Sequence, residues 1–266
     1  MGRTMDGRRL RRVRLFCSDI DGTLAGNSDA EARFCQTWHS LAPDDRPLLV
    51  LNSGRLIEDQ KAFIATTALP KPDIYIGGVG TMLDHEREPS HAALYSGSIG
   101  AGFDRERIAS ALSDMPDITI QPDVYQHAQK SSWYLLDAEA ATLAAIEERL
   151  ANAGIAARLV YSSNRDLDIL PKGVDKGAAL SWLCRQLGLS HDDVVVAGDT
   201  NNDRSMFDLP GTRGIVVGNA LPELKAVAAD RPDIYCSAGD IADGVLEGLQ
   251  HWGLFPRVSR KKHSSP

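Results

Sequence analysis

Short apolar runs alternate with stretches of helical spacing along the first third of the chain. The apolar runs cover residues 15–18, 48–51 and 74–76. Each run is bounded by polar, Gly or Pro residues, and runs of this length predict buried strands. Between the runs, Phe34, Trp38 and Leu41 lie at helical spacing, and residues 56–67 form a second helix candidate. Strands that alternate with helices predict a parallel sheet with right-handed crossovers.

The pattern changes after Met82, where the regular alternation stops. A charged stretch that ends in Pro89 and a Gly- and Ser-rich stretch at 96–102 precede several strands in close succession. The strands are expected at residues 118–120, 131–136, 157–161 and 167–170, and two helices at 105–113 and 138–153. This arrangement indicates an α+β module inserted into the parallel-sheet domain.

The alternation of strands and helices resumes at Lys172 and continues to Trp252. Asp175 is a good N-cap for a helix, and strands are expected at residues 194–197, 215–217 and 234–236. We therefore predict an α/β fold, with a parallel-sheet core and an inserted α+β module. The predicted division is 1–83 for the first part of the core, 84–171 for the module, 172–256 for the second part of the core and 257–266 for a disordered tail.

Charge and composition limit the classes of partner. The formal net charge of −7 argues against nucleic acid as the main partner. No apolar run is long enough to span a bilayer, and the Arg-rich start lacks the apolar stretch of a secretory signal. The four cysteines show no paired spacing for zinc or redox chemistry. We therefore expect a cytoplasmic protein with reduced thiols, no membrane partner and, as the default, a monomeric state.

Two carboxylates, Asp19 and Asp21, directly follow the first predicted strand. Buried carboxylates are costly unless they are paired or bound to a cation, and residues i and i+2 of an extended chain point the same way. Gly22 then allows the backbone to turn sharply. Asp19 can attack phosphorus to form an aspartyl phosphate, while Asp21 can move the proton of the leaving group. The alternative is an Asp-rich turn that only ends a strand.

Three further polar clusters follow predicted strands or begin a helix. Residues 52–55, Asn-Ser-Gly-Arg, can form a phosphate cradle. Lys176 lies at a predicted helix start, where the helix dipole disfavours a positive charge. A role in neutralising a phosphate would explain its presence there. Residues 198–203 offer hard oxygen ligands suited to Mg²⁺. Each cluster alone also fits a turn or a solvated surface. Because ligands bind at the carboxyl ends of parallel strands, however, we expect all four clusters to converge.

These four clusters give the chain a resemblance to the haloacid dehalogenase superfamily of phosphatases. Asp19 with Asp21, then Ser53, Lys176 and residues 199–203 match its motifs in order. Within the superfamily the chain is similar to the sucrose-phosphate phosphatase subgroup, whose cap follows the third core strand, and there most of all to bacterial mannosylfructose-phosphate phosphatases. The stretches that carry this likeness are 52–55, 76–81, 79–83, 125–127, 130–134, 161–171 and 182–184. The resemblance implies a Rossmann-like core with an α+β cap.

The resemblance also implies a mechanism and a ligand set. Asp19 is expected to be the nucleophile, and Asp21 the acid and base. Mg²⁺ is expected to contact an Asp19 oxygen, the Asp21 backbone carbonyl and Asp199, with Asp203 placed to orient water ligands or Lys176. The residues expected to hold the phosphoryl oxygens are Ser53, Gly54, Lys176 and Asn202.

Sugar recognition must come from the cap, because the core motifs contact only phosphate and metal. Gln126, His127 and Lys130 precede a predicted strand and are candidates, with Arg55 reaching in from the core. A solvated cap loop is the alternative. The expected substrate is a disaccharide phosphate, mannosylfructose 6-phosphate ahead of sucrose 6-phosphate or another phosphorylated glycoside. A sugar phosphomutase and a non-catalytic sugar-phosphate-binding module are the competing hypotheses.

Overall fold

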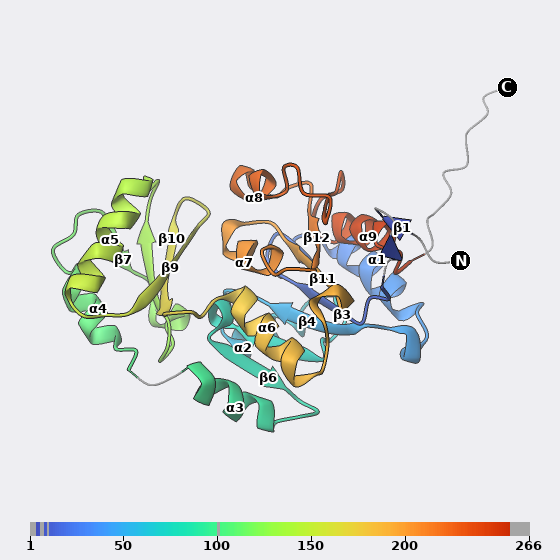
Figure 1. The fold of residues 1–266 in the computed structure, drawn as a ribbon, viewed down its shortest axis with the longest axis horizontal. Helices are drawn as coiled ribbons and strands as arrows, with labels where there is room; N and C mark the ends of the chain where they lie inside the picture. Colours follow the sequence, from blue (N-terminus) through green and yellow to red (C-terminus); the bar gives the residue numbers. More distant parts are fainter. Residues whose placement is uncertain (1–3, 6–7, 10, 100–101, 256–266) are drawn as a thin grey trace.

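Among the residues that the computed structural model describes, a seven-stranded sheet forms the centre of the larger domain, called the core (Figure 1). The structure describes residues 4–5, 8–9, 11–99 and 102–255. The strands lie in the order β13-β12-β11-β3-β4-β5-β6. Their bounds are Leu15–Ser18 for β3, Leu48–Asn52 for β4, Ile74–Gly77 for β5, Met82–His85 for β6, Val194–Gly198 for β11, Arg213–Val216 for β12 and Ile234–Cys236 for β13. Neighbouring strands are parallel except β5 and β6, so the predicted parallel sheet is confirmed.

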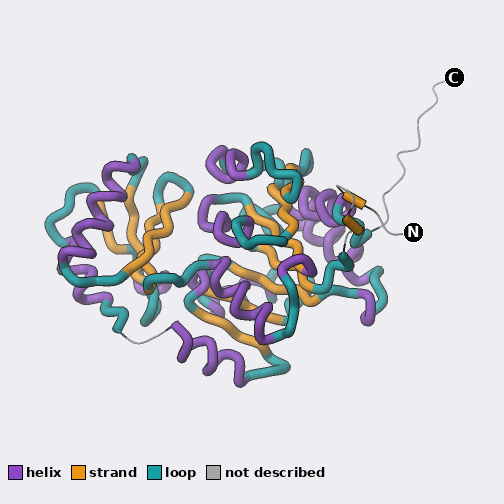
Figure 2. Tube along the Cα trace, in the orientation of Figure 1, coloured by secondary structure: helices purple, strands orange, loops and turns teal. Residues whose placement is uncertain are grey.

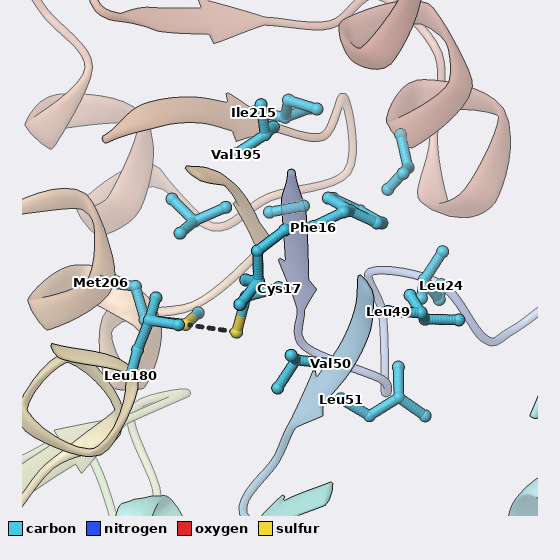
Figure 3. Packing of buried hydrophobic residues seen from close by; sticks show 14 of the residues in the cluster. Phe16, Cys17, Leu24, Leu49, Val50, Leu51, Leu180, Val195, Met206 and Ile215 are labelled. Carbon is cyan, nitrogen blue, oxygen red and sulfur yellow. Dashed lines mark hydrogen bonds between the residues drawn. The ribbon is translucent and has the colours of Figure 1, made fainter. Parts of the chain in front are cut away.

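Helices cover both faces of this sheet, because its central strands are apolar on both sides. The core helices are α1 (Ser28–His39), α2 (Ile57–Ile64), α3 (Ser90–Ile99), α6 (Lys176–Gln186), α7 (Arg204–Phe207), α8 (Pro222–Val227) and α9 (Ile241–His251). Phe16 of β3 packs on Phe34 and Trp38 of α1, with ring centroids 6.3 and 6.0 Å away. The next residue, Cys17, points away from Phe16, and its Sγ lies 3.7 Å from Met206 Sδ of α7 (Figure 3). Alternate residues of β3 therefore anchor helices on opposite faces of the sheet.

Within the described range 102–255, a four-stranded antiparallel sheet builds the smaller domain, called the cap, which lies beside the core (Figure 2). Its strands lie in the order β7-β8-β10-β9. The cap elements are α4 (Arg105–Leu112), β7 (Ile118–Ile120), β8 (Ser131–Leu135), α5 (Ala140–Asn152), β9 (Ala157–Ser162) and β10 (Asp166–Pro171). Trp133 and Leu167 pack with α4 and α5 in one apolar cluster. Because side chains alternate along a strand, Ser132 and Asp168 lie on the other, polar face of the sheet.

The predicted start of the cap at residue 84 falls inside the core. β6 pairs with β5, and α3 packs against the core through Tyr95, whose ring lies 5.0 Å from that of Trp182 in α6. The polar and small residues of these two elements explain why the sequence pattern assigns them to the cap. The boundary therefore moves to a position after α3, while the predicted end at residue 171 coincides with the end of β10. The predicted tail, 257–266, lies outside the described residues.

Several smaller features complete the fold. A short antiparallel pair, β1 (Thr4–Met5) and β2 (Arg8–Arg9), precedes the core. The four cysteines are all free thiols, and two of them, Cys17 and Cys184, are buried. No helix in the described part of the chain is both long enough and apolar enough to cross a membrane.

Candidate active site

Asp19 lies at the carboxyl end of β3, the middle strand of the core sheet. Its backbone N–H donates to the carbonyl of Ala197 in β11 at 3.1 Å, which continues the strand pairing by one residue. The Asp19 side chain is almost fully buried. Lys176 Nζ, which is fully buried at the start of α6, donates to Asp19 Oδ1 at 2.7 Å and to Asp203 Oδ1 at 2.6 Å. Three of the predicted site residues are therefore in direct contact.

The loop of residues 198–203, called the acidic loop, follows β11 and brings two more carboxylates to Asp19. One oxygen each of Asp19, Asp199 and Asp203 lies within 4.8 Å of the others. Asp203 Oδ2 accepts from the backbone N–H groups of Asp199 and Thr200, at 3.0 and 3.2 Å. Asp203 is thus already engaged through both oxygens and holds the loop in shape, whereas Asp199 retains free acceptor capacity.

Burial makes this group of carboxylates electrostatically unfavourable on its own. Asp19, Asp199 and Asp203 are at most 8% exposed, and Lys176 offsets only one of their three negative charges. Burial raises the pKa of Asp19 to about 7 although Lys176 opposes the shift. Burial and the charges of Asp19 and Asp203 raise the pKa of Asp199 to about 8. A divalent cation would offset the two remaining charges, and carboxylate oxygens are ligands that Mg²⁺ accepts. The donor set therefore fits Mg²⁺.

Asp21 is held by Arg55 rather than by the buried cluster. Arg55 Nε and Nη2 donate to Asp21 Oδ2 and Oδ1 at 2.7 and 2.8 Å. Arg55 Nη1 donates to Asp59 Oδ2 at 2.9 Å, and the guanidinium lies over the Phe63 ring, 4.2 Å from its centroid. The Asp21 side chain is about half exposed. Arg55 therefore orients Asp21 at the edge of the carboxylate cluster, a role that the sequence did not indicate.

Close backbone approaches shape the loops around Asp19. Gly22 has a φ of 76°, and a β-carbon there would overlap an oxygen of Asp199, so glycine is required at this position. Ser53 Oγ accepts from the Arg55 backbone N–H at 3.2 Å in the loop after β4. The predicted phosphate contacts Ser53, Gly54 and Asn202 all line the same cavity as Asp19. The fourth predicted phosphate contact, Lys176, is fully buried beside Asp19 and is not among the described lining residues. Most of the predicted core site therefore surrounds one space.

This cavity, of about 770 Å³, extends from the carboxylate cluster to the polar face of the cap sheet. Cap residues that line it include Gln121, Tyr134, Arg165, Asp166 and Asp168. The antiparallel register sets Asp166 opposite Tyr134 and Asp168 opposite Ser132, so these side chains share one face. Polar residues that alternate with buried Leu167 and Ile169 were the available sequence signal for this surface.

Two cationic side chains on the cap side of the cavity, Lys130 and Arg165, each lie beside a carboxylate. Lys130 is buried, and its Nζ lies 3.1 Å from Asp168 Oδ1 and 3.3 Å from the backbone carbonyls of Gly54 and Tyr125. Arg165 Nη2 lies 2.9 Å from Asp166 Oδ2. Carboxylates and phenolic hydroxyls at this end of the cavity suit the hydroxyl groups of a neutral sugar.

Only two of the four predicted sugar contacts lie on the cavity. Arg55 and Lys130 line it, whereas Gln126 and His127 are not among its described lining residues. Gln126 Nε2 donates to the carbonyls of Gln121 and Ser132, and its Oε1 accepts from the Ser132 N–H. Its amide thus serves the backbone of the cap loop. The structure therefore does not bring Gln126 or His127 to this cavity, and the Gln126 amide serves the fold instead.

Several known proteins that resemble this chain are phosphatases that act on sugar phosphates. The profile of the sucrose-6F-phosphate phosphohydrolase family matches residues 12–253. The mannosylfructose-phosphate phosphatase of Agrobacterium fabrum is 52% identical over 248 residues, which cover 93% of this chain and 100% of that protein. Sucrose-phosphatase 1 of Nicotiana tabacum is 29% identical over 257 residues. The match covers 92% of this chain and 60% of the tobacco protein.

A solved structure shows the same arrangement of core and cap. The sucrose-phosphatase of Synechocystis sp. PCC6803, in complex with sucrose and phosphate, matches with a TM-score of 0.80 and 25% identity. The match covers 91% of this chain and 98% of that one. The chain therefore belongs to the sucrose-6F-phosphate phosphohydrolase family of phosphatases, and its fold is that of the haloacid dehalogenase phosphatases.

Proposed function

We propose that this phosphatase hydrolyses mannosylfructose 6-phosphate to mannosylfructose and inorganic phosphate. One observation carries the proposal: a single cavity joins the Asp19 cluster to the polar face of the cap sheet. A substrate that fits must therefore carry a phosphate at one end and hydroxyl groups at the other. The 52% identity with the Agrobacterium fabrum enzyme over 93% of this chain favours mannosylfructose over sucrose as the sugar.

In the proposed first step, a carboxylate oxygen of Asp19 attacks phosphorus and the bond from phosphorus to the sugar oxygen breaks. Asp21 gives its proton to the departing sugar oxygen. In the second step, water attacks the phosphorus of the aspartyl phosphate while Asp21 takes up a proton, so that Asp19 and phosphate are released. Lys176 stays beside Asp19 throughout and offsets negative charge at the attacking oxygen.

The residues that would hold Mg²⁺ are Asp19, Asp199 and the backbone carbonyl of Asp21. When bound, the ion supplies charge neutralisation between the carboxylate and the phosphate group, which otherwise repel. Asp203 acts differently in this proposal, because its oxygens are occupied by Lys176 and by backbone N–H groups. It keeps the acidic loop and Lys176 in position.

Arg55 fixes the orientation of the Asp21 carboxyl group, which must transfer a proton in the proposed mechanism. Both Asp21 oxygens accept from Arg55, so proton transfer to the leaving group requires one of these hydrogen bonds to yield to the substrate. Arg55 then remains anchored by Asp59 and by its contact with Phe63. The phosphoryl oxygens would be held by Ser53, the Gly54 N–H, Lys176 and Asn202.

Phosphate release from a panel of phosphorylated sugars in the presence of Mg²⁺ tests the proposal. The panel contains mannosylfructose 6-phosphate, sucrose 6-phosphate, a glycosylglycerate phosphate and a small aryl phosphate. We expect the highest kcat/KM for mannosylfructose 6-phosphate. A preference for sucrose 6-phosphate would move the assignment to the related activity, phosphoryl transfer back to sugar would indicate a mutase, and no turnover of any compound would indicate a binding module.

We further propose that the protein acts as a monomer in the cytoplasm and without a nucleic-acid partner. The net charge of −7 supports the last point, because a polyanion would be repelled. Light scattering of the purified protein, with and without substrate, tests the monomeric state. A mass of twice that of the chain would refute it.

A further inference from the structure

The acidic loop is tied directly to the cap by one side chain. Asn201 lies between Asp199 and Asp203 and begins the short helical turn Asn201–Asp203. Its Nδ2 donates to the backbone carbonyl of Tyr161 in β9 at 2.9 Å. Neither the metal ligands nor the phosphate contacts proposed above explain this hydrogen bond, which joins two domains rather than two parts of one loop.

The partner strand, β9, is at the edge of the cap sheet and faces the core (Figure 1). An edge strand has backbone groups that its own sheet leaves unpaired, and Asn201 supplies a donor for one of them. Tyr161 is itself fixed in the cap: its hydroxyl donates to the Leu135 carbonyl at 3.0 Å and accepts from the Ala138 N–H at 2.9 Å. Asn201 therefore connects two segments that are each held by further hydrogen bonds.

A second contact lies on the same edge of β9. Arg158 Nη2 is 2.8 Å from Asp175 Oδ2. Asp175 is the N-cap of α6, where its Oδ1 accepts from the Ala178 N–H at 2.7 Å, and it directly precedes Lys176. The two contacts, Asn201 with Tyr161 and Arg158 with Asp175, are called the β9 seam. The seam joins the cap to both core segments that carry charge next to Asp19.

Beyond its attachment to the core, β9 leads into the part of the cavity wall that the cap supplies. The residues after Tyr161 turn through Ser163 and Asn164, both at positive φ, and continue to Arg165 and Asp166. Ser163, Arg165 and Asp166 line the same cavity as Asp199 and Asn202 of the acidic loop. The seam therefore sets the distance between the part of the site that would contact the sugar and the part that would hold the phosphate.

We propose that Asn201 is a positioning residue that fixes the distance between the sugar-contacting and the phosphate-holding parts of the site. A substrate that carries both groups can then occupy both parts at once. The inference rests on the proposed function. A ligand with two joined groups gains from binding only when the two subsites stand at the matching separation. A ligand that contacts the phosphate end alone gains nothing from the spacing. Asn201 thus acts on substrate choice without touching substrate.

Removal of the Asn201 amide should have a selective and moderate effect. One hydrogen bond corresponds to about a two- to tenfold change in an equilibrium, and Arg158 and Lys130 still join cap to core. For Asn201→Ala we expect kcat/KM for mannosylfructose 6-phosphate to fall about two- to tenfold, mainly through KM. We expect kcat/KM for a small aryl phosphate and the inhibition constant of inorganic phosphate to stay unchanged. Arg158→Gln should act in the same direction.

Asn219→Ala is the matched control. Asn219 Nδ2 donates to the Gly22 carbonyl at 2.7 Å and its Oδ1 accepts from the Ile241 N–H, so it supports the Asp19 loop from within the core. Its loss should affect the disaccharide phosphate and the aryl phosphate equally. Equal losses on both substrates for Asn201→Ala, no loss on the disaccharide phosphate, or a selective loss for Asn219→Ala would each overturn the inference. Wild-type protein that cleaves aryl phosphate but no glycoside phosphate would overturn the proposed function, and this inference with it.

Discussion

Lys176 provides the most stringent test of the charge arrangement at Asp19. It is fully buried and is shared by Asp19 and Asp203, with nitrogen–oxygen distances of 2.7 and 2.6 Å. Burial alone would lower the pKa of Lys176, but the charges and hydrogen bonds of these two carboxylates raise it above its ordinary value. The ammonium therefore stays charged across the neutral range, and Lys176→Met removes a full positive charge at nearly constant volume.

The expected loss of folding stability follows from Asp19 and Asp203, which lose their buried cation. Removing one partner of a buried ion pair destabilises a protein by about 3–5 kcal/mol. In a domain of this size, 1 kcal/mol lowers Tm by about 2–4 °C, so Lys176→Met should lower Tm by about 6–20 °C. The loss should be smaller at about pH 6 than at about pH 8.5, because Asp19 and Asp199, with pKa values of about 7 and 8, can take up protons in the folded state.

Thermal unfolding without divalent metal at both pH values is the assay, and Lys172→Met is the matched control. Lys172 is exposed and makes none of the contacts described above, so its replacement should leave Tm within about 1 °C. Phosphate release from an aryl phosphate should fall at least about a hundredfold for Lys176→Met, since a charge-stabilising donor is lost. A Tm for Lys176→Met within about 2 °C of wild type at about pH 8.5 would refute the reasoning.

Three further predictions address the nucleophile, the metal and the sugar. Asp19→Asn should abolish phosphate release from every substrate while Tm stays equal or rises, because one of three crowded carboxylates becomes neutral; a variant that still turns over substrate would exclude Asp19 as the nucleophile. The folded-state pKa values of Asp19 and Asp199 lie above the ordinary Asp value, so their contribution to stability falls as pH rises from about 4 to about 8. Mg²⁺ must displace these protons, and it should therefore raise Tm more at about pH 8.5 than at about pH 6; an equal rise would argue against a site on these carboxylates. Tyr134→Ala should raise KM for the disaccharide phosphate about tenfold and leave the aryl phosphate unaffected, and equal effects would place the sugar elsewhere.

The core sheet could be predicted because its strands are buried on both faces. Residues 194–198 are all buried, so the strand appears in the sequence as a continuous apolar run between polar loops. β6 gives no such run, because an edge strand is covered unevenly: Leu83 and His85 are buried, while Asp84 between them is not. α3 is attached to the core mainly through Tyr95, and its Ser, Gly and Ala residues show no apolar stripe. The early cap boundary follows from these two elements.

The core half of the site was predictable for a topological reason. Parallel strands bring their carboxyl ends to one edge of the sheet, so Asp19, Ser53 and Asp199 converge whatever the details of packing. The cap offers no comparable rule. Whether Asp168 faces the cavity depends on which face of β10 is buried against α4 and α5, and its neighbours depend on the register with β8. The alternation of polar residues with Leu167 and Ile169 indicates that β10 has two unlike faces, but the neighbours across the sheet depend on long-range pairing that a single sequence does not display.

The contrast between Gln126 and Lys130 shows what decides the role of a polar residue in such a loop. Both are buried, and both precede β8. Gln126 uses its amide for backbone groups that the loop leaves unpaired, and a buried unpaired backbone group costs about 1–3 kcal/mol. Lys130 also contacts two backbone carbonyls, but its charge requires Asp168, a residue of the cavity wall. A neutral amide can be satisfied by the fold alone. A buried ammonium needs a carboxylate, and here that requirement places it at the site.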